Sequence, residues 1–297
     1  MMRSSLDPAR QILRAQVGLD DSTLFAVGSE NMHDRDHVTQ VNEAYHDAIA
    51  GHYDDRFEGH SDDVLRWVRG LFEREVFPAL DAFGGTPRVI DFGCGSGYLE
   101  DFLIGRELDL LGIDVSEGML ARARERFPMW RFEKRDLYSF PSDERFHLVM
   151  ENAVLHHLVD YDALVDKMAA MTLPGGILYL GNEPNRRAYK YLKPLVNAYR
   201  STINRYRTET AVSELGDADF EALSEYHLFY GEGIDAQAIA GRLSAQGFRR
   251  VEIHYSLREL FSALEEASPR VKLNAWTPDR IRDHFPLSRN FTLIAQR

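Results

Sequence analysis

The sequence predicts an α/β fold built on a doubly wound, mainly parallel sheet. Short apolar segments alternate with helical segments from residue 88 to residue 181. A glycine-rich turn, residues 93–97, follows the first of these apolar segments, and an acidic residue ends each of the first three. Strands that alternate with helices at this pace pair in parallel through right-handed crossovers. We therefore expect a ligand site at the carboxyl edge of the sheet.

Composition limits the class of protein. The chain has 297 residues, of which 44% are hydrophobic and 28% charged, and a formal net charge of −12. This is typical of a globular protein, and the negative charge opposes general nucleic-acid binding. The single cysteine excludes an intramolecular disulfide and favours a reducing compartment. Because no secretory signal and no run of about 20 apolar residues is present, we expect a cytoplasmic protein without a membrane partner.

Four parts are expected along the chain. Residues 1–40 form a weakly patterned N-terminal extension, and residues 41–185 form the ligand-binding core with lid helices. Residues 186–247 look mainly helical and too long for a loop, which predicts a helical cap insertion. Residues 248–297 return two closing strands to the core, with an inserted segment between them.

Within the core, apolar residues at helical spacing predict helices up to residue 83, and Gly84-Gly85-Thr86-Pro87 ends them. A helix is expected to begin at 98–103, and others at 118–126 and 161–171, with a turn at 173–176. The expected strands are residues 88–92, 108–114, 130–136, 146–150, 177–180, 248–255 and 291–295.

The turn after the first strand favours close approach of a ligand. Glycines at 93, 95 and 97 allow positive φ and carry no Cβ to block a ligand. Their G-x-G-x-G spacing differs from the G-x-G-x-x-G of dinucleotide folds, and Asp91 just ahead would repel a pyrophosphate. The pattern suits a ligand with a cationic amino group and disfavours a nicotinamide-dependent oxidoreductase. A tight structural turn would carry the same glycines.

Two further acids follow the next strands. Asp114 lies about 20 residues after the glycines, where ribose hydroxyls would lie, although it could also begin a helix. Asp136 ends the third strand and could accept a hydrogen bond from an adenine amino group, while Leu137 packs on the ring. Since these ends share one edge of the sheet, a nucleoside-containing ligand is indicated.

Residues 87–181 resemble the core of the class I S-adenosylmethionine-dependent methyltransferases of small-molecule type. The matching segments are VIDFGCGSGYLE, LLGIDVSEGMLARAR, FEKRDLYSFP, FHLVMENAVLHHLVD and LPGGILYLGNEPN. The resemblance implies a Rossmann-like seven-stranded sheet and S-adenosylmethionine as cofactor. His147 departs from the family, which usually has Asp there, and so do the roughly 35 residues between the last two strands.

The resemblance also assigns cofactor contacts. The methionyl end, the ribose and the adenine would each contact one group of residues, and an aromatic residue of the lid helix would cover the cofactor. These are, respectively, Asp91, Gly93, Cys94, Gly95 and Asn152; Asp114 and Val115; Asp136 and Leu137; and Tyr45 or Tyr53.

Catalysis would depend first on alignment, because a sulfonium methyl is already activated. A hydroxyl or ammonium acceptor would also need a base. His156 and His157 follow the fourth strand and are the leading candidates, since histidine titrates near neutrality. Glu183, at the end of the fifth strand, is the next candidate. For each of the three, a structural role is the alternative, and at most one of the two histidines is expected to face the cavity.

Two other patterns remain open. Residues 186–207 hold seven Arg or Lys and four Tyr and no acid. They could clamp an anionic or carrier-bound substrate, or form a solvated helix face with inward tyrosines, which we favour. His33 and His37 have the spacing of a metal pair, but no third ligand is evident, so no metal is predicted.

The sequence therefore predicts an enzyme that methylates a small molecule on oxygen or nitrogen. The alternatives are a protein or nucleic-acid methyltransferase and a non-catalytic S-adenosylmethionine-binding subunit. Macromolecular substrates are opposed by the net charge and by Glu151-Asn152-Ala153-Val154, which stands where an N/D-P-P-Y/F tetrapeptide would be expected. The sequence specifies neither the acceptor nor the oligomeric state.

Overall fold

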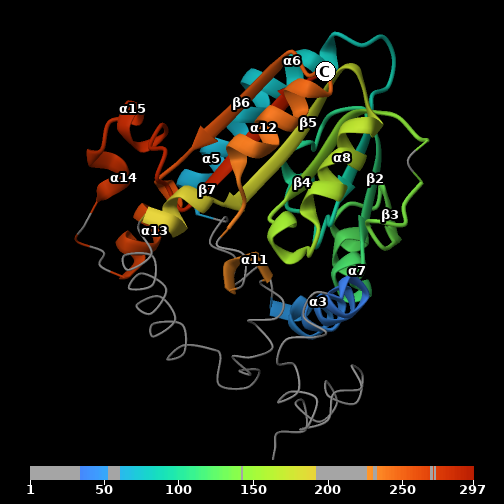
Figure 1. Ribbon diagram of the computed structural model, residues 1–297, viewed down its shortest axis with the longest axis horizontal. Coiled ribbons are helices and arrows are strands. Elements are labelled where there is room, and N and C mark those ends of the chain that lie inside the picture. The colour runs from blue at the N-terminus through green and yellow to red at the C-terminus, as the bar shows by residue number, and fades with distance from the viewer. Residues whose placement is uncertain are drawn as a thin grey trace, which may run out of the picture.

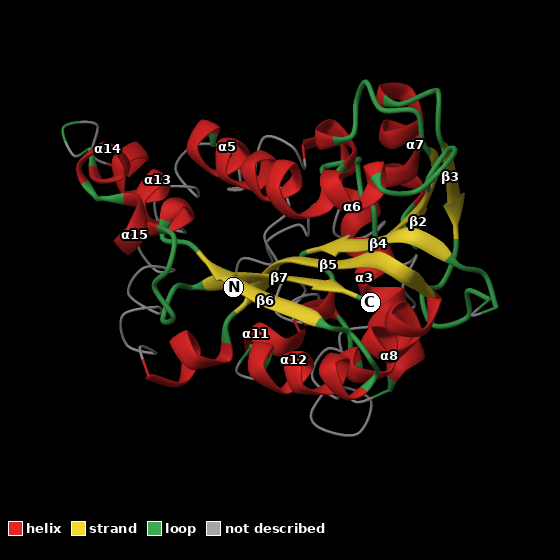
Figure 2. Cartoon of the chain, turned by 90° about the horizontal axis from the view of Figure 1, so that it is seen from above, coloured by secondary structure: helices red, strands yellow, loops and turns green. Residues whose placement is uncertain are grey.

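The computed structural model describes residues 34–52, 61–141, 143–191, 226–229, 233–267, 270 and 272–297. Within them lies one seven-stranded sheet of order β3-β2-β1-β4-β5-β7-β6 (Figures 1 and 2). The strands β1 to β5 are parallel, and β7 is antiparallel to both its neighbours. The predicted α/β class with a Rossmann-like seven-stranded sheet is confirmed. The strands are β1 (Arg88–Phe92), β2 (Asp109–Asp114), β3 (Arg131–Lys134), β4 (Phe146–Asn152), β5 (Thr172–Pro184), β6 (Arg250–Tyr255) and β7 (Asn290–Gln296).

Helices cover both faces of the sheet, with α5, α6 and α7 on one side and α8 and α12 on the other (Figure 2). The helix α3 lies across the carboxyl ends of the strands (Figure 1). The helices are α3 (Arg35–Ile49), α5 (Asp62–Leu71), α6 (Phe77–Asp81), α7 (Glu117–Arg126), α8 (Tyr161–Met171), α11 (Tyr226–Phe229), α12 (Ala236–Ala245), α13 (Arg258–Ala267), α14 (Leu273–Trp276) and α15 (Asp279–Arg282), with a π-turn η3 (Phe72–Val76) and 3₁₀ turns η1 (Ala50–His52), η4 (Glu100–Phe102) and η5 (Leu155–His157). Among the described helices, none is long and apolar enough to cross a membrane.

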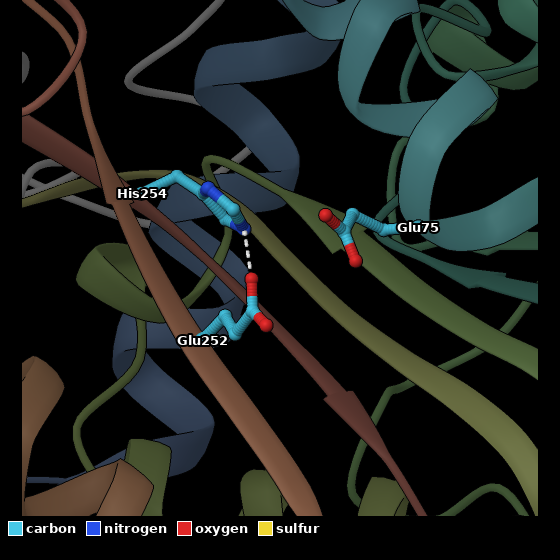
Figure 3. A group of neighbouring side chains, drawn as sticks. All are labelled: Glu75, Glu252 and His254. Atoms are coloured by element: carbon cyan, nitrogen blue, oxygen red, sulfur yellow. Dashed lines mark ion pairs between the residues drawn. The ribbon is translucent and has the colours of Figure 1, made fainter. Parts of the chain in front are cut away.

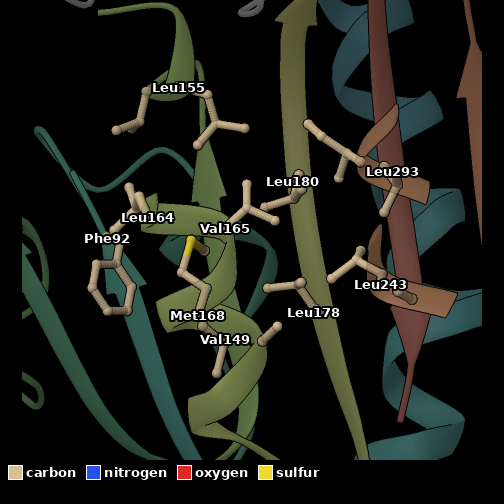
Figure 4. Packing of buried hydrophobic residues seen from close by; sticks show 14 of the residues in the cluster. Phe92, Val149, Leu155, Leu164, Val165, Met168, Leu178, Leu180, Leu243 and Leu293 are labelled. Atoms are coloured by element: carbon tan, nitrogen blue, oxygen red, sulfur yellow. The ribbon is translucent and has the colours of Figure 1, made fainter. Parts of the chain in front are cut away.

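Successive strand residues point to opposite faces, so each face carries its own core. In β4, Val149 belongs to the same buried cluster as Val165 and Met168 of α8 and Leu243 of α12 (Figure 4). Its neighbour Leu148 joins the other core, which α5 and α6 cover. Burial on both faces explains why the central strands are apolar throughout. Packing on both faces also holds these strands in place, so that their ends meet at one edge of the sheet.

The structure corrects several predicted boundaries. Residues 173–176, expected as a turn, belong to β5, where the pairing register with β4 shifts near Phe146. The helix expected from residue 98 is only the 3₁₀ turn η4. The end of the region assigned to the cap, α12, is a core helix, because Ile239 and Leu243 pack on the sheet. Residues 192–225 of that region lie outside the described residues.

The segment between the last two strands folds into the short helices α13, α14 and α15 beyond the β6 edge (Figure 1). Arg258 holds it together: its Nε and Nη2 each lie 2.8 Å from a carboxylate oxygen of Asp283. Such a two-point pair is geometrically specific. This segment packs beside α5 and leaves the carboxyl edge of β1 and β2 clear.

Candidate functional site

A pocket of about 650 Å³, including its open mouth, lies at the carboxyl ends of β1, β2 and β4 under α3. It is lined by predicted cofactor residues (Gly93, Gly95, Asp114, Val115, Asp136, Leu137 and Asn152), by the predicted catalytic residue His157, and by residues that the sequence did not single out (Thr39, Asn42, His46, Met119, Tyr138, Ala153, Val154 and Leu158).

The glycine turn forms the floor of the pocket. Gly93 and Gly95 have φ of 70° and 54°, a backbone conformation that residues with a side chain rarely adopt. A Cβ on Gly93 would lie 2.5 Å from Cγ2 of Val154. The turn is tied to β2, because the amides of Gly93 and Cys94 both donate to the carbonyl of Ile113. Glycine at residue 93 is thus required by backbone conformation and by space.

Asp114 links the turn to the start of α7. Its Oδ2 accepts the Gly95 N–H at 2.9 Å, and its Oδ1 accepts the Ser116 N–H at 2.8 Å. The cap of α7 is Ser116, whose Oγ accepts the Met119 N–H. Burial raises the pKa of Asp114, and the hydrogen bonds from backbone amides oppose that shift. A carboxylate has about four acceptor positions, and backbone amides do not use all of them, so acceptor capacity remains for ligand hydroxyls.

The side walls of the pocket follow β3 and β4, which flank the β2–β1 pair in the sheet. Leu137 is buried in the wall, and Asp136 Oδ1 accepts the Ser139 N–H at 2.8 Å. Beside Asn152, Ala153 has a φ of 60°, and its amide donates to the Gly181 carbonyl. A non-glycine residue in this region is strained, and such strain clusters at functional sites.

The helix α3 closes the pocket with Thr39, Asn42 and His46. Asp47 docks the helix, since its Oδ1 accepts from Ser116 Oγ at 2.6 Å and from the Gly118 amide at 2.9 Å. Thr39, Asn42 and His46 are spaced so that they share one face of a helix, and this spacing is visible in the sequence. The prediction of a lid rests instead on the aromatic residues Tyr45 and Tyr53.

Asn42 is an unpredicted polar residue of the pocket wall. Its Nδ2 donates to the carbonyls of Val38 at 3.0 Å and His157 at 3.2 Å, which fixes the orientation of the amide. Its Oδ1 is buried without a hydrogen-bond partner. A buried acceptor normally has a donor, so a ligand donor is expected there.

The two adjacent histidines lie in different places. His157 lines the pocket, and its ring meets that of His46 edge-on at 5.3 Å. His156 is buried behind it, with the two rings 4.1 Å apart. His46 Nδ1 lies 2.8 Å from the Asn42 carbonyl. One imidazole pair, from α3 and η5, therefore borders the pocket.

Glu183 lies behind η5 and not in the pocket wall. Its Oε1 accepts the amides of Val154 and Leu155 at 2.8 and 2.7 Å. Its Oε2 lies 3.2 Å from the His156 amide and 3.0 Å from His156 Nδ1. The carboxyl is fully buried and holds the turn that carries both histidines.

Four other predicted cofactor residues do not line the pocket or are not described. The Asp91 carboxyl is buried, and burial, followed by the nearby Glu100, raises its pKa well above the usual range. Cys94 packs in the core, where a Cβ on Gly112 would lie 2.9 Å from its Sγ. The ring of Tyr45 stands edge-on to His46, and it is His46, not Tyr45, that lines the pocket. Tyr53 lies outside the described residues.

One group of described residues has the donor atoms for a metal ion: Glu75, Glu252 and His254, between η3 and β6 (Figure 3). Burial lowers the pKa of His254 to about 4. Arg250, however, already provides a cation, with Nη2 2.8 Å from Glu75 and Nε 2.5 Å from Glu252. We therefore assign this group as an ion-pair cluster.

Of the basic stretch 186–207, the structure describes residues 186–191, which are helical. Tyr189 is buried and Tyr191 is exposed. Arg186 lies 3.4 Å from Asp235. The remainder of the stretch lies outside the described residues, as does His33 of the histidine pair.

Comparison with known proteins gives one family match, a methyltransferase domain over residues 89–176. Trans-aconitate 2-methyltransferase from Variovorax paradoxus is 35% identical over 135 residues, which cover 41% of this chain and 52% of that protein. The protein of the same name from Methylobacterium nodulans is 39% identical over 123 residues, covering 39% and 47%. The chain thus spans about half the length of these curated relatives.

Two solved structures resemble the whole fold. The DhpI-SAM-HEP complex covers 88% of this chain and 97% of its own, with a TM-score of 0.50 and 15% identity. The putative methyltransferase solved with the Haloferax volcanii Trm112 activator covers 87% and 96%, with a TM-score of 0.50 and 13% identity. At such identity the likeness shows the fold alone, and it agrees with the strand order described above.

Proposed function

We propose that this chain, which carries a class I S-adenosylmethionine-dependent methyltransferase domain, methylates a small-molecule acceptor on oxygen or nitrogen. The observation that carries the proposal is one pocket with two chemically different ends. The glycine turn and Asp114 suit a nucleoside with a cationic amino acid attached. His157 and His46 border the same space and can meet an acceptor.

The residues present fit the cofactor. Asp114 has free acceptor positions for the ribose hydroxyls, and Asn42 Oδ1 is a buried acceptor that lacks a donor. Asp136 and Leu137 would hold the adenine, and Gly93 leaves space at the methionyl end. When bound, S-adenosylmethionine supplies an electrophilic methyl group on a sulfonium. The lid helix would exclude water by closing on these contacts.

We propose a carboxylate-bearing molecule as the first acceptor class to test. The curated relatives are named for trans-aconitate, a small organic acid. A carboxylate oxygen is nucleophilic without losing a proton, so His157 would only orient it. For a hydroxyl or amine acceptor, an imidazole nitrogen of His157 would take the proton released as the new bond to carbon forms. In both cases the geometry of η5 decides where the acceptor lies.

Two measurements test the proposal. Calorimetric titration should give micromolar binding of S-adenosylhomocysteine and none of NAD. A methyl-transfer assay with labelled S-adenosylmethionine against small organic acids, alcohols and amines should yield one labelled product class. Binding of NAD without any response to S-adenosylhomocysteine would overturn the cofactor assignment. Transfer only to protein or nucleic acid would overturn the acceptor assignment.

A further inference from the structure

Two glutamates behind the pocket converge on a single amide. Glu151 of β4 and Glu183 of β5 are both fully buried. The Val154 nitrogen lies 3.0 Å from Glu151 Oε2 and 2.8 Å from Glu183 Oε1. One N–H between two buried carboxyls leaves their oxygens close together. Two ionised carboxylates in that arrangement repel each other strongly, so one of them must carry a proton.

The hydrogen-bond partners show which carboxyl carries it. Glu183 accepts the amides of Val154, Leu155 and His156, and its Oε2 also lies 3.0 Å from His156 Nδ1. The backbone offers Glu151 the shared amide, its side-chain contact is with Glu183, and its Oε1 has no partner among the described residues. Among the described residues, no lysine or arginine forms an ion pair with either carboxyl. Three backbone amides stabilise the anion on Glu183, and Glu151 is left as the acid.

The surroundings support a neutral Glu151. Burial, followed by the charge of Glu183, raises its pKa well above the usual range. Within the described part of the chain, the other titratable groups that interact with the pair are Asp91 of β1, Tyr179 of β5, His156 of η5 and His227 of α11, and none of them is a fixed cation. Burial lowers the pKa of His227 to about 4, so this imidazole is also neutral at pH 7.

We propose that Glu151 and Glu183 share one proton and act as a positioning pair. Neutral Glu151 donates a hydrogen bond to ionised Glu183, and Glu183 anchors η5 so that His157 is presented to the pocket. The pair acts through the turn and touches neither cofactor nor acceptor. Its catalytic consequence rests on the proposed function, whereas the shared proton does not.

The shared proton is tested by stability against pH in wild type and Glu151→Gln, whose amide can donate as the acid does. Because the folded protein keeps this proton to a higher pH than the unfolded chain does, the proton stabilises wild type at low pH. This stabilisation is lost as the pH rises toward the folded-state pKa. The glutamine cannot ionise, so the variant has no such loss. The Tm of Glu151→Gln relative to the Tm of wild type should therefore rise by about 3 °C or more between pH 5 and pH 9. A difference that stays constant with pH would refute the shared proton.

A second measurement uses the unaltered protein and so does not depend on how a variant folds. In a sample labelled with ¹³C at glutamate carboxyls, resonances of protonated carboxyls should persist at pH 7. Glu100, whose pKa burial raises to about 8, should give one, and Glu100→Gln should remove it. A second must remain in Glu100→Gln and belong to Glu151 or Glu183. Its absence would exclude the shared proton.

The positioning role is tested by Glu183→Gln, which can offer one acceptor oxygen where two are used. We expect kcat to fall by about tenfold or more, the pH profile to shift, and S-adenosylhomocysteine affinity to change by less than about twofold. The matched control is Glu144→Gln, which alters a partly exposed glutamate paired with Arg88 and should keep wild-type turnover. Unchanged kcat in Glu183→Gln would overturn the role. The stability and carboxyl measurements need no acceptor, so failure to find an acceptor would leave them decisive.

Discussion

Replacing Asp114 with asparagine tests the cofactor end of the pocket most directly. In the wild type, the two carboxylate oxygens accept from Gly95 and Ser116, and their remaining positions face the pocket. Asparagine keeps one of these two oxygens. Its NH₂ group would face one of the two backbone N–H groups, which would then lose its acceptor. A lost charge-assisted hydrogen bond costs about 1.5–3 kcal/mol. Since about 1.4 kcal/mol is a factor of ten, the affinity for S-adenosylhomocysteine should fall by about 10- to 150-fold.

The assay is calorimetric titration at pH 7 of wild type and variant, with thermal unfolding measured alongside. Asp109→Asn is the matched control, because it makes the same chemical change at the exposed start of the same strand, beside Arg131. An analogue of S-adenosylhomocysteine without the ribose hydroxyls should bind wild type more weakly than S-adenosylhomocysteine does. For the Asp114 variant, removing these hydroxyls should change the affinity little. Equal affinity of wild type and variant, or fully additive losses, would refute the ribose assignment.

Three further results are expected. Asn42→Leu should weaken S-adenosylhomocysteine binding about five- to tenfold by removing an acceptor from the pocket wall, and calorimetry that finds no change would remove Asn42 from the site. Gly93→Ala should lower Tm more than Gly105→Ala and abolish binding, because both positions have positive φ but only Gly93 lacks room for a Cβ; equal Tm losses would show that the contact with Val154 relaxes. His254 has a folded-state pKa lowered to about 4, so the unfolded chain binds more protons below about pH 6.5 and stability falls as pH drops; urea unfolding of His254→Gln should show a smaller loss between pH 7 and pH 5, and an identical loss would contradict this.

The sequence predicts that several residues after the strands gather in one pocket, because each signal there is local. Gly93, Asp114 and Asp136 lie within a few residues of a strand end, and the parallel order of strands brings these ends to one edge. No long-range packing has to be known for that conclusion. The same locality explains why the glycine spacing and the acid ahead of it can distinguish cofactor classes.

Residues placed by tertiary packing were beyond that reasoning. Asn42 and His46 reach the pocket only because α3 docks through Asp47 onto the start of α7. The length of β5 depends on its pairing with β7, which comes from more than 100 residues further along the chain. The choice between His156 and His157 depends on the anchor at Glu183, whose partners come from a turn almost 30 residues away. Periodicity carries no information about such contacts.

Asp91 shows how a residue can act on the site without lining it. Its carboxyl is buried, and burial, then Glu100 and then Asp114 raise its pKa, so Asp91 and Asp114 interact electrostatically. When Asp91 or Asp114 ionises, the electrostatic potential at the glycine turn becomes more negative. Solvent screens this potential only weakly, because the acids are buried. A pyrophosphate would be repelled there, and a ligand with a sulfonium and an ammonium would be attracted. The acid before the glycines would therefore favour a cationic ligand through its field when it ionises, although burial and the nearby Glu100 raise its pKa well above the usual range.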